Sequence, residues 1–246
     1  MIMVSSFAMT ACGGGGDSPA SPPVTTKAEG VYSGTLTGST SSAFQLLVLE
    51  NDEYWTVYGR NTPGMFLVTG VVQGQGISTN TTFTSSNAKD FGVSPPTTGT
   101  ITANYVVDVS MNGTLSLPGG TVTFSGAPIV RTTYDYNAAA NPAAIVGVWS
   151  LTALDGSVAA LNIGSTGAIT GNSGGCTFTG TIAPRASGKN VFNTSVTFGP
   201  APCLRAGQTA TGIGLSYPIA GTATRQLVIV GVDSGRTAGT ALFGTR

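Results

Sequence analysis

The sequence predicts an all-β protein, made of two tandem antiparallel β-barrel (or sandwich) modules of about eight short strands each. Short runs of Val, Ile, Leu and Phe alternate with turn signals that draw on 36 glycines. Only 8% of the residues are charged, against roughly 25% in an ordinary soluble domain, so Ser and Thr supply the polar surface. Outside residues 135–146, no segment of ten or more residues has helical periodicity.

A short internal repeat divides the chain into two modules. Gly30-Val31-Tyr32-Ser33 recurs as Gly147-Val148-Trp149-Ser150, and each copy opens a segment of about 100 residues. We therefore expect the first β module at residues 29–130 and the second at 147–246. Residues 131–146 are expected to be a linker, or to form one short helical turn that ends before Pro142.

The first module opens on the repeat and continues with clear strand and turn signals. Residues 44–49 form an apolar run, residues 54–58 are aromatic and β-branched, and residues 50–53 between them form a polar hairpin tip. Leu117-Pro118-Gly119-Gly120-Thr121 is a further turn signal. Strands are expected near residues 30–38, 44–50, 53–60, 65–74, 77–85, 99–108, 110–117 and 120–126.

The second module shows the same organisation. Asp155-Gly156 marks a hairpin turn, and so does Ser165-Thr166-Gly167. The longest apolar run outside the N-terminal stretch, residues 227–232, is only strand length. Strands are expected near residues 147–153, 157–163, 167–172, 175–183, 189–198, 208–217, 224–231 and 238–244.

The residue types present exclude several classes of chemistry. The chain has no histidine, which excludes Ser-His-Asp and Cys-His catalysis and histidine-based zinc sites. A net charge of zero argues against a nucleic-acid partner. Glu50, Asp52 and Glu53 cluster on one turn, but their spacing matches no cation-binding loop such as the EF-hand. We therefore predict no catalytic residues, no metal and no cofactor.

The cysteines point to an exported protein. Cys176 and Cys203 form an even pair, which predicts a disulfide that closes a loop of about 27 residues in the second module. The alternative is two free thiols, and the CxxC spacing of a redox pair is absent.

The third cysteine follows a short apolar stretch whose last residues before the cysteine are mostly small. Met9-Thr10-Ala11-Cys12 resembles a bacterial lipobox, and a glycine run follows it. The resemblance implies a signal peptide at residues 1–11, a lipidated (palmitate-bearing) Cys12, and a flexible tether at 12–28. It places the protein at the cell envelope, anchored to the outer membrane. The glycine run is similar to the start of transferrin-binding-protein-like surface lipoproteins.

The second module also resembles a known group of barrels. Gly147-Val148-Trp149 is similar to the first-strand signature of lipocalin-type (calycin) barrels, in which the tryptophan closes one end. Some single barrels with this opening and one disulfide inhibit exported proteases. The resemblance therefore implies barrel closure, and it adds protease inhibition as an alternative function.

Two features suggest where a partner could bind. Tyr54 and Tyr58 share one face of a predicted strand that also carries Arg60, so the tyrosines are the candidate exposed pair of a stacking platform. In addition, residues 29–130 carry six acidic and two basic residues, a net charge of −4, whereas residues 147–246 carry two acidic and six basic, a net charge of +4. The two halves could pack together, or the basic half could face an acidic partner.

The function most consistent with these features is non-catalytic. We expect a cell-envelope lipoprotein with a binding or interaction role. Its expected partner is another envelope protein, a polysaccharide or a small apolar ligand. The alternatives are an inhibitor of an exported protease, a small-ligand-binding barrel, or an enzyme with a carboxylate-based site. An open apolar cavity inside a barrel would favour a small ligand.

Overall fold

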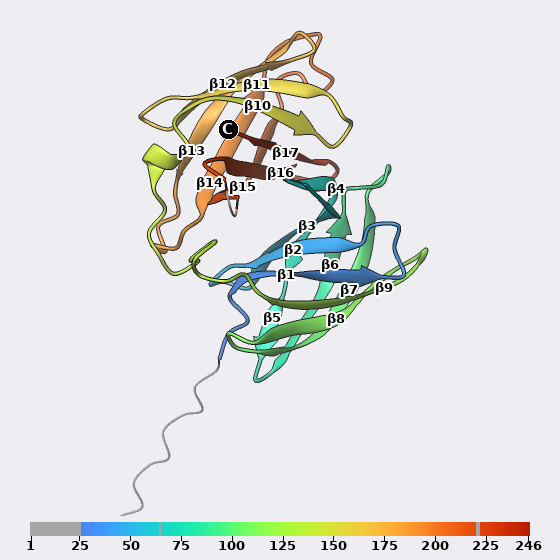
Figure 1. The fold of residues 1–246 in the computed structure, drawn as a ribbon. Coiled ribbons are helices and arrows are strands. Elements are labelled where there is room, and N and C mark those ends of the chain that lie inside the picture. The colour runs from blue at the N-terminus through green and yellow to red at the C-terminus, as the bar shows by residue number, and fades with distance from the viewer. Residues whose placement is uncertain (1–25, 64, 220–221) are drawn as a thin grey trace, which may run out of the picture.

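The structure, a computed structural model, describes residues 26–63, 65–219 and 222–246 as two closed antiparallel β-barrels in tandem (Figure 1). The predicted fold class is therefore confirmed. The predicted signal peptide and Cys12 lie outside the described residues. No helix in the described ranges is both long and apolar enough to cross a membrane.

The first barrel runs from Gly30 to Pro128. Its sheet has the order β4-β3-β2-β1-β9-β8-β7-β6-β5, and it closes where β4 pairs with β6 at Val72–Asp90 and Gln73–Lys89. The strands are β1 (Gly30–Thr37), β2 (Ala43–Val48), β3 (Glu53–Thr62), β4 (Met65–Gln75), β5 (Ile77–Thr79), β6 (Thr82–Asp90), β7 (Thr97–Val106), β8 (Ser110–Leu117) and β9 (Gly120–Pro128).

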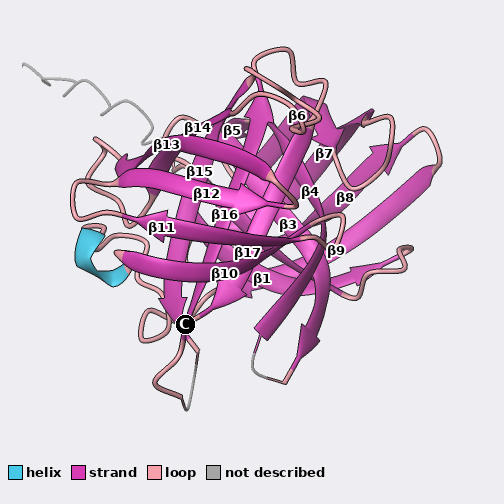
Figure 2. Ribbon diagram, turned by 90° about the horizontal axis from the view of Figure 1, so that it is seen from above, coloured by secondary structure: helices cyan, strands magenta, loops and turns pink. Residues whose placement is uncertain are grey.

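The second barrel runs from Gly147 to Thr245 and follows a simple up-and-down order that ends where β10 pairs with β17. A 3-10 turn, η1 (Pro142–Ala144), precedes it and is the one helical element of the described residues (Figure 2). The strands are β10 (Gly147–Ala153), β11 (Val158–Ile163), β12 (Ala168–Ser173), β13 (Cys176–Pro184), β14 (Phe192–Phe198), β15 (Thr209–Pro218), β16 (Arg225–Asp233) and β17 (Gly239–Thr245).

Two local expectations were wrong. The strand expected at residues 77–85 is two strands, because Asn80 takes a left-handed backbone (φ 56°) and ends β5. The helical turn expected before Pro142 instead begins at that proline. The Asn141 side chain accepts a hydrogen bond from the backbone N–H of Ala143, and proline fits the first helical position.

The internal repeat has a structural counterpart, because both copies close one end of a barrel in the same way. Tyr32 and Trp149 are each at most 2% exposed. Tyr32 donates its hydroxyl to the carbonyl of Ala28 at 3.0 Å, and Trp149 donates its indole N–H to the carbonyl of Ile145 at 2.8 Å. In both cases the acceptor lies four residues earlier, just before the first strand. The repeat is therefore an end closure that satisfies the polar atom of a buried aromatic residue.

The buried side chains form three clusters. One lines the interior of the first barrel, and one fills the interior of the second. The third lies between the barrels, where outward-facing residues of β2, β3 and β4 pack against outward-facing residues of β15, β16 and β17. In Figure 1, β16 and β17 lie directly against β4. As a result β16 is buried on both faces, with Leu227 and Ile229 inside its barrel and Val228, Val230 and Val232 in the interface.

Ion pairs also join the two barrels. Arg185 donates to Glu50 at 2.8 Å, and Lys189 lies 3.5 Å from Glu29. Two basic residues of the second half thus meet two acidic residues of the first, which agrees with the interpretation that the oppositely charged halves pack together. The linker contributes as well, since Tyr134 and Tyr136 are both buried in the interface.

Candidate functional site: an apolar cavity in the first barrel

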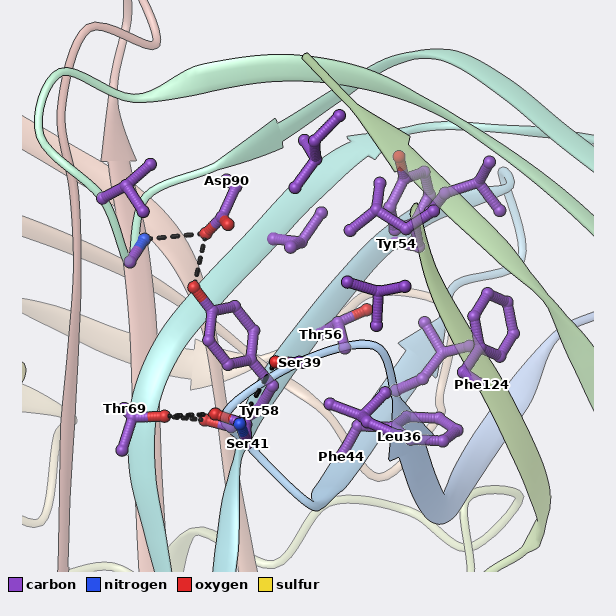
Figure 3. A pocket seen from close by; sticks show the side chains of 18 of the residues that line it. Leu36, Ser39, Ser41, Phe44, Tyr54, Thr56, Tyr58, Thr69, Asp90 and Phe124 are labelled. Atoms are coloured by element: carbon purple, nitrogen blue, oxygen red, sulfur yellow. Dashed lines mark hydrogen bonds between the residues drawn. The ribbon is translucent and has the colours of Figure 1, made fainter. Parts of the chain in front are cut away.

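The first barrel contains a cavity of about 340 Å³ (Figure 3). Its lining includes loops and strand ends at one end of the barrel, at residues 36–41, 92–93 and 115–122, so this end is the open one. Apolar side chains make up most of the inner wall: Leu36, Phe44, Leu46, Val72, Phe83, Ile101, Met111, Leu115 and Phe124. The volume falls within the roughly 300–1,000 Å³ typical of small-molecule sites.

The other end of the first barrel is closed by the chain that enters it. Ala28 is fully buried, and its backbone N–H donates to the Ser78 hydroxyl at 3.1 Å. The hydroxyls of Tyr32 and Tyr105 donate to the carbonyls of Ala28 and Thr26. Because these backbone and hydroxyl groups are hydrogen-bonded in place, residues 26–28 form a fixed floor beneath the cavity.

The interior of the second barrel is occupied differently. Large side chains fill it, among them Trp149, Leu161, Phe178 and Phe192, all at most 5% exposed. The two barrels therefore share a fold but differ inside, and the cavity of about 340 Å³ belongs to the first one.

A polar cluster interrupts the apolar wall near the open end. Tyr58 donates its hydroxyl to Oδ1 of Asp90 at 2.7 Å, and the backbone N–H of Gly92 donates to the same oxygen at 2.8 Å. Burial raises the pKa of the Tyr58 hydroxyl, and the hydrogen bond to Asp90 and the charge of Asp90 raise it further. Tyr58 therefore stays protonated and acts as a donor. Beside it, the hydroxyls of Ser41 and Thr69 are 3.0 Å apart (Figure 3).

Of the predicted binding residues, Tyr54 and Tyr58 line the cavity and Arg60 is exposed. The expected exposure of the tyrosine pair was wrong: Tyr54 is 0% exposed and Tyr58 is half-buried. Both faces of β3 are covered, because the tyrosines face the barrel interior and Trp55 and Val57 face the second barrel. Burial raises the pKa of Tyr54 more than the hydrogen bond with Ser85 and the charge of Arg236 lower it, and the pKa is raised to about 12.

Two glycines of β4 make room for these tyrosines. Gly74 is the cross-strand partner of Tyr54, and Gly70 is the partner of Tyr58. A Cβ at either glycine would collide with the facing tyrosine ring, and a Cβ at Gly92 would collide with the Tyr58 hydroxyl. The equal spacing of Tyr54 to Tyr58 and of Gly70 to Gly74 is a signal in the sequence that could have revealed the pairing.

Asp90 and Gly92 were missed by sequence reasoning. A β-bulge in β6 shifts the register between Ser85 and Ala88. Before the bulge Phe83 and Ser85 are buried, and after it Ala88 and Asp90 are buried instead. The bulge thus changes which residues face the interior, and regular alternation would have pointed Asp90 outward.

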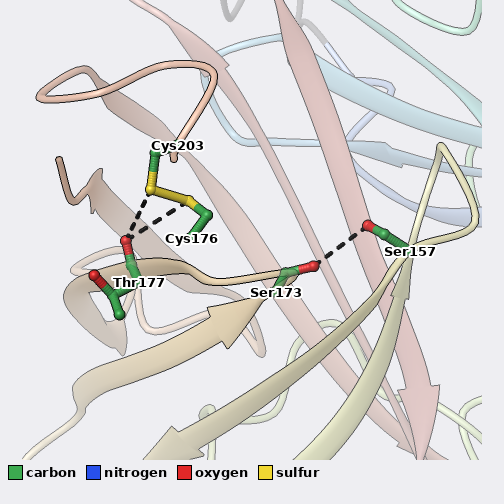
Figure 4. The surroundings of a disulfide bond; sticks show 5 residues. All are labelled: Ser157, Ser173, Cys176, Thr177 and Cys203. Atoms are coloured by element: carbon green, nitrogen blue, oxygen red, sulfur yellow. Dashed lines mark hydrogen bonds between the residues drawn. A yellow bond between two sulfur atoms is a disulfide. The ribbon is translucent and has the colours of Figure 1, made fainter. Parts of the chain in front are cut away.

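The predicted disulfide is confirmed. Cys176 at the start of β13 is bonded to Cys203 in the loop between β14 and β15, with the Cα atoms 4.5 Å apart (Figure 4). Both residues belong to the second barrel, so the bond braces that barrel and takes no part in the cavity.

The acidic turn after β2 separates its three carboxylates. Glu50 pairs with Arg185 across the barrel interface, Asp52 accepts a hydrogen bond from the Ser78 hydroxyl, and Glu53 accepts one from the indole N–H of Trp55. Within the described ranges, no group of three or more metal-ligating side chains is present.

The cavity carries few ionisable side chains. Among its described lining residues, Asp90 is the one carboxylate and there is no Lys or Arg, so it lacks the carboxylate pair that the enzyme alternative requires. Comparison of the chain with protein-family models, curated proteins and solved structures gave no match, so the interpretation of this site depends on its geometry.

Proposed function

We propose that this protein is a cell-envelope lipoprotein whose first barrel binds a small, largely apolar molecule. The observation that carries the proposal is the cavity of about 340 Å³, open at one end and lined mainly by apolar side chains. Burying a ligand's apolar surface against such a wall is worth roughly 25 cal/mol per Å² removed from water. The site is preformed, because one end of the barrel is closed and the lining side chains are carried by paired strands. A preformed site lowers the entropic cost of binding.

The second barrel has a supporting part in this proposal. Its filled interior and its disulfide make it a rigid body, and its β16 and β17 cover the outer face of β3 and β4. Those two strands carry Tyr54, Tyr58 and Thr69, which line the cavity. The second barrel therefore holds one wall of the binding site in place.

The proposed anchor is lipidated Cys12. The first described residues enter the first barrel at its closed end, where the carbonyl of Thr26 accepts the Tyr105 hydroxyl. A membrane anchor upstream of this point leaves the cavity mouth at the far end of the barrel from the tether.

Ligand binding can be tested with the full chain and the neutral apolar dye N-phenyl-1-naphthylamine. We expect saturable fluorescence enhancement in the wild type and at least a tenfold loss of affinity in Thr56→Trp, because Thr56 lines the middle of the cavity. Thr179→Trp, at an exposed strand position of the second barrel, is the matched control and should bind normally. No saturable binding by the wild type, or equal binding by Thr56→Trp, would overturn the proposal.

The anchor has a separate test. Cells that express the full chain are labelled with radioactive palmitate, and the protein is recovered from the membrane fraction. We expect label in the wild type and none in Cys12→Ser. Unlabelled wild-type protein would remove the lipoprotein part of the proposal without affecting the ligand-binding part.

A second candidate function, inhibition of an exported protease, is favoured by one observation. Leu204 is fully exposed directly after the disulfide-bonded Cys203, so the second barrel presents a braced apolar side chain to solvent. Titration against a panel of secreted proteases tests this function. Inhibition that Leu204→Asp abolishes would support it, and no inhibition of any protease would exclude it.

A further inference from the structure

One buried carboxylate in the cavity lacks a charge partner. Asp90, the last residue of β6, is 6% exposed and lines the cavity. The ion pairs of the described residues join Lys27 to Asp52, Arg131 to Asp108, Arg185 to Glu50 and Lys189 to Glu29, and none of them includes Asp90. An unpaired charge in an apolar setting is costly, so its presence here calls for a compensating group.

The hydrogen bonds of Asp90 use only one of its two oxygens. Oδ1 accepts from both Tyr58 and Gly92, whereas Oδ2 accepts no hydrogen bond from the described residues. Oδ2 also keeps some accessible surface, since the fully buried side-chain atoms without a hydrogen-bond partner do not include it. Figure 3 shows the Asp90 side chain directed at Tyr58 and the pocket interior. Tyr58 and Gly92 therefore hold the carboxylate in place through Oδ1 and leave Oδ2 free to accept a hydrogen bond from a ligand.

The other lining residues indicate the chemistry of the rest of the ligand. Figure 3 shows Ser39, Ser41 and Thr69 on the same side of the pocket as Asp90, and the apolar side chains of Leu36, Phe44 and Phe124 on the other side. No basic side chain of the described lining competes for the carboxylate. The site thus has an apolar compartment with a single anionic position near its mouth.

We propose that the ligand of the first barrel is a small amphiphile with an apolar body and one protonated amine, which pairs with Oδ2 of Asp90. This inference rests on the proposed function and names the chemical class of its ligand. Charge-assisted hydrogen bonds to a carboxylate in a largely apolar site are stronger than neutral ones. The amine also compensates the buried charge, so the same contact favours the amine over a neutral or anionic head group.

Head-group selectivity can be measured with three probes of equal chain length. Octylammonium, octanol and octanoate are each used to displace N-phenyl-1-naphthylamine from the wild-type full chain. We expect octylammonium to bind at least tenfold more tightly than octanol, and octanoate to bind most weakly. Because the apolar tail is constant, the differences report on the head group alone.

Asp90→Asn is the variant that isolates the charge, since its side-chain oxygen can still accept from Tyr58 and Gly92. We expect octylammonium affinity to fall at least tenfold in Asp90→Asn while octanol changes less than twofold. Asp108→Asn removes an exposed carboxylate at the opposite end of the same barrel and should leave all three affinities unchanged.

The outcomes separate the two proposals. If octanol displaces the dye but octylammonium binds no more tightly than octanol, the inference is wrong and the apolar-ligand function stands. An unchanged octylammonium affinity in folded Asp90→Asn also overturns it. If Asp90→Asn does not fold, the wild-type comparison of the three head groups decides. If no probe and no dye binds the wild type, the proposed function fails and the inference fails with it.

Discussion

Gln226 takes the place of a neighbouring strand for part of β4. Because β6 pairs with β4 only at Val72 and Gln73, the first half of β4 is a sheet edge inside the barrel interface. The backbone N–H of Phe66 donates to Oε1 of Gln226 at 3.2 Å, and Nε2 of Gln226 donates to the Phe66 carbonyl at 3.2 Å. Gln226 is 1% exposed and Phe66 is 4% exposed, so water cannot replace these bonds.

Gln226→Leu is expected to destabilise the protein by about 2 kcal/mol. Each backbone group left buried without a partner costs about 1–3 kcal/mol, which amounts to about 2–6 kcal/mol for the two. The apolar surface of the leucine recovers on the order of 1–2 kcal/mol on burial. A loss of about 2 kcal/mol lowers the folding equilibrium constant roughly 30-fold.

Equilibrium urea unfolding measures this loss, with the two tryptophans as local probes. Trp55 lies in the barrel interface and Trp149 lies inside the second barrel, so Phe substitution of either one separates the two signals. Gln208→Leu, at an exposed position, is the matched control and should change the free energy of unfolding by less than about 0.5 kcal/mol. A Gln226→Leu protein within that same range of the wild type would refute the argument that Gln226 covers an edge.

Three further changes test other parts of the fold. Removal of the disulfide by Cys176→Ser with Cys203→Ser should cost about 3.5 kcal/mol, from the chain entropy of a loop with a sequence separation of 27. Equal urea midpoints with and without the bond would contradict this. Trp149→Ala should cost about 3–5 kcal/mol, and Val148→Ala, at an exposed position, should cost almost nothing. Burial alone would raise the pKa of Glu50, but backbone and Arg185 hydrogen bonds and the nearby basic charges lower it. Since the folded-state pKa is depressed, the stabilisation is present above the unfolded-state pKa and is lost as the pH falls below about 4.5 through the folded value. Glu50→Gln should therefore show a smaller acid-induced loss of stability than the wild type, and identical pH profiles would exclude the ion pair as a source of stability.

The strands could be predicted from sequence because their signals are local. Of the sixteen expected strands, only the one at residues 77–85 is interrupted, and the turns at Asp155-Gly156 and at Leu117 to Thr121 separate strands as expected. Glycine and polar turn residues act through backbone conformation, which neighbouring residues largely decide. The disulfide was predictable for a different reason, since two cysteines of one module leave a single pairing.

The site was harder to predict because it depends on contacts between distant strands. A strand pattern shows that Tyr54 and Tyr58 share a face, but it does not show that a second barrel covers the opposite face of β3. The apolar runs at residues 44–49 and 227–232 carried part of this information, since a strand buried on both faces has no polar side. Asp90 depends on a bulge, which strand periodicity does not reveal.

The all-β class, the tandem arrangement and the repeat that places Tyr32 and Trp149 at equivalent positions followed from the sequence alone, because spacing, turn residues and a repeat are properties of neighbouring positions. Only the tertiary structure decided that the first barrel is hollow, that the second is filled, and that Asp90 faces the cavity. Those properties depend on how side chains from many strands share one interior volume. That volume is set by register, bulges and the packing of one barrel on the other.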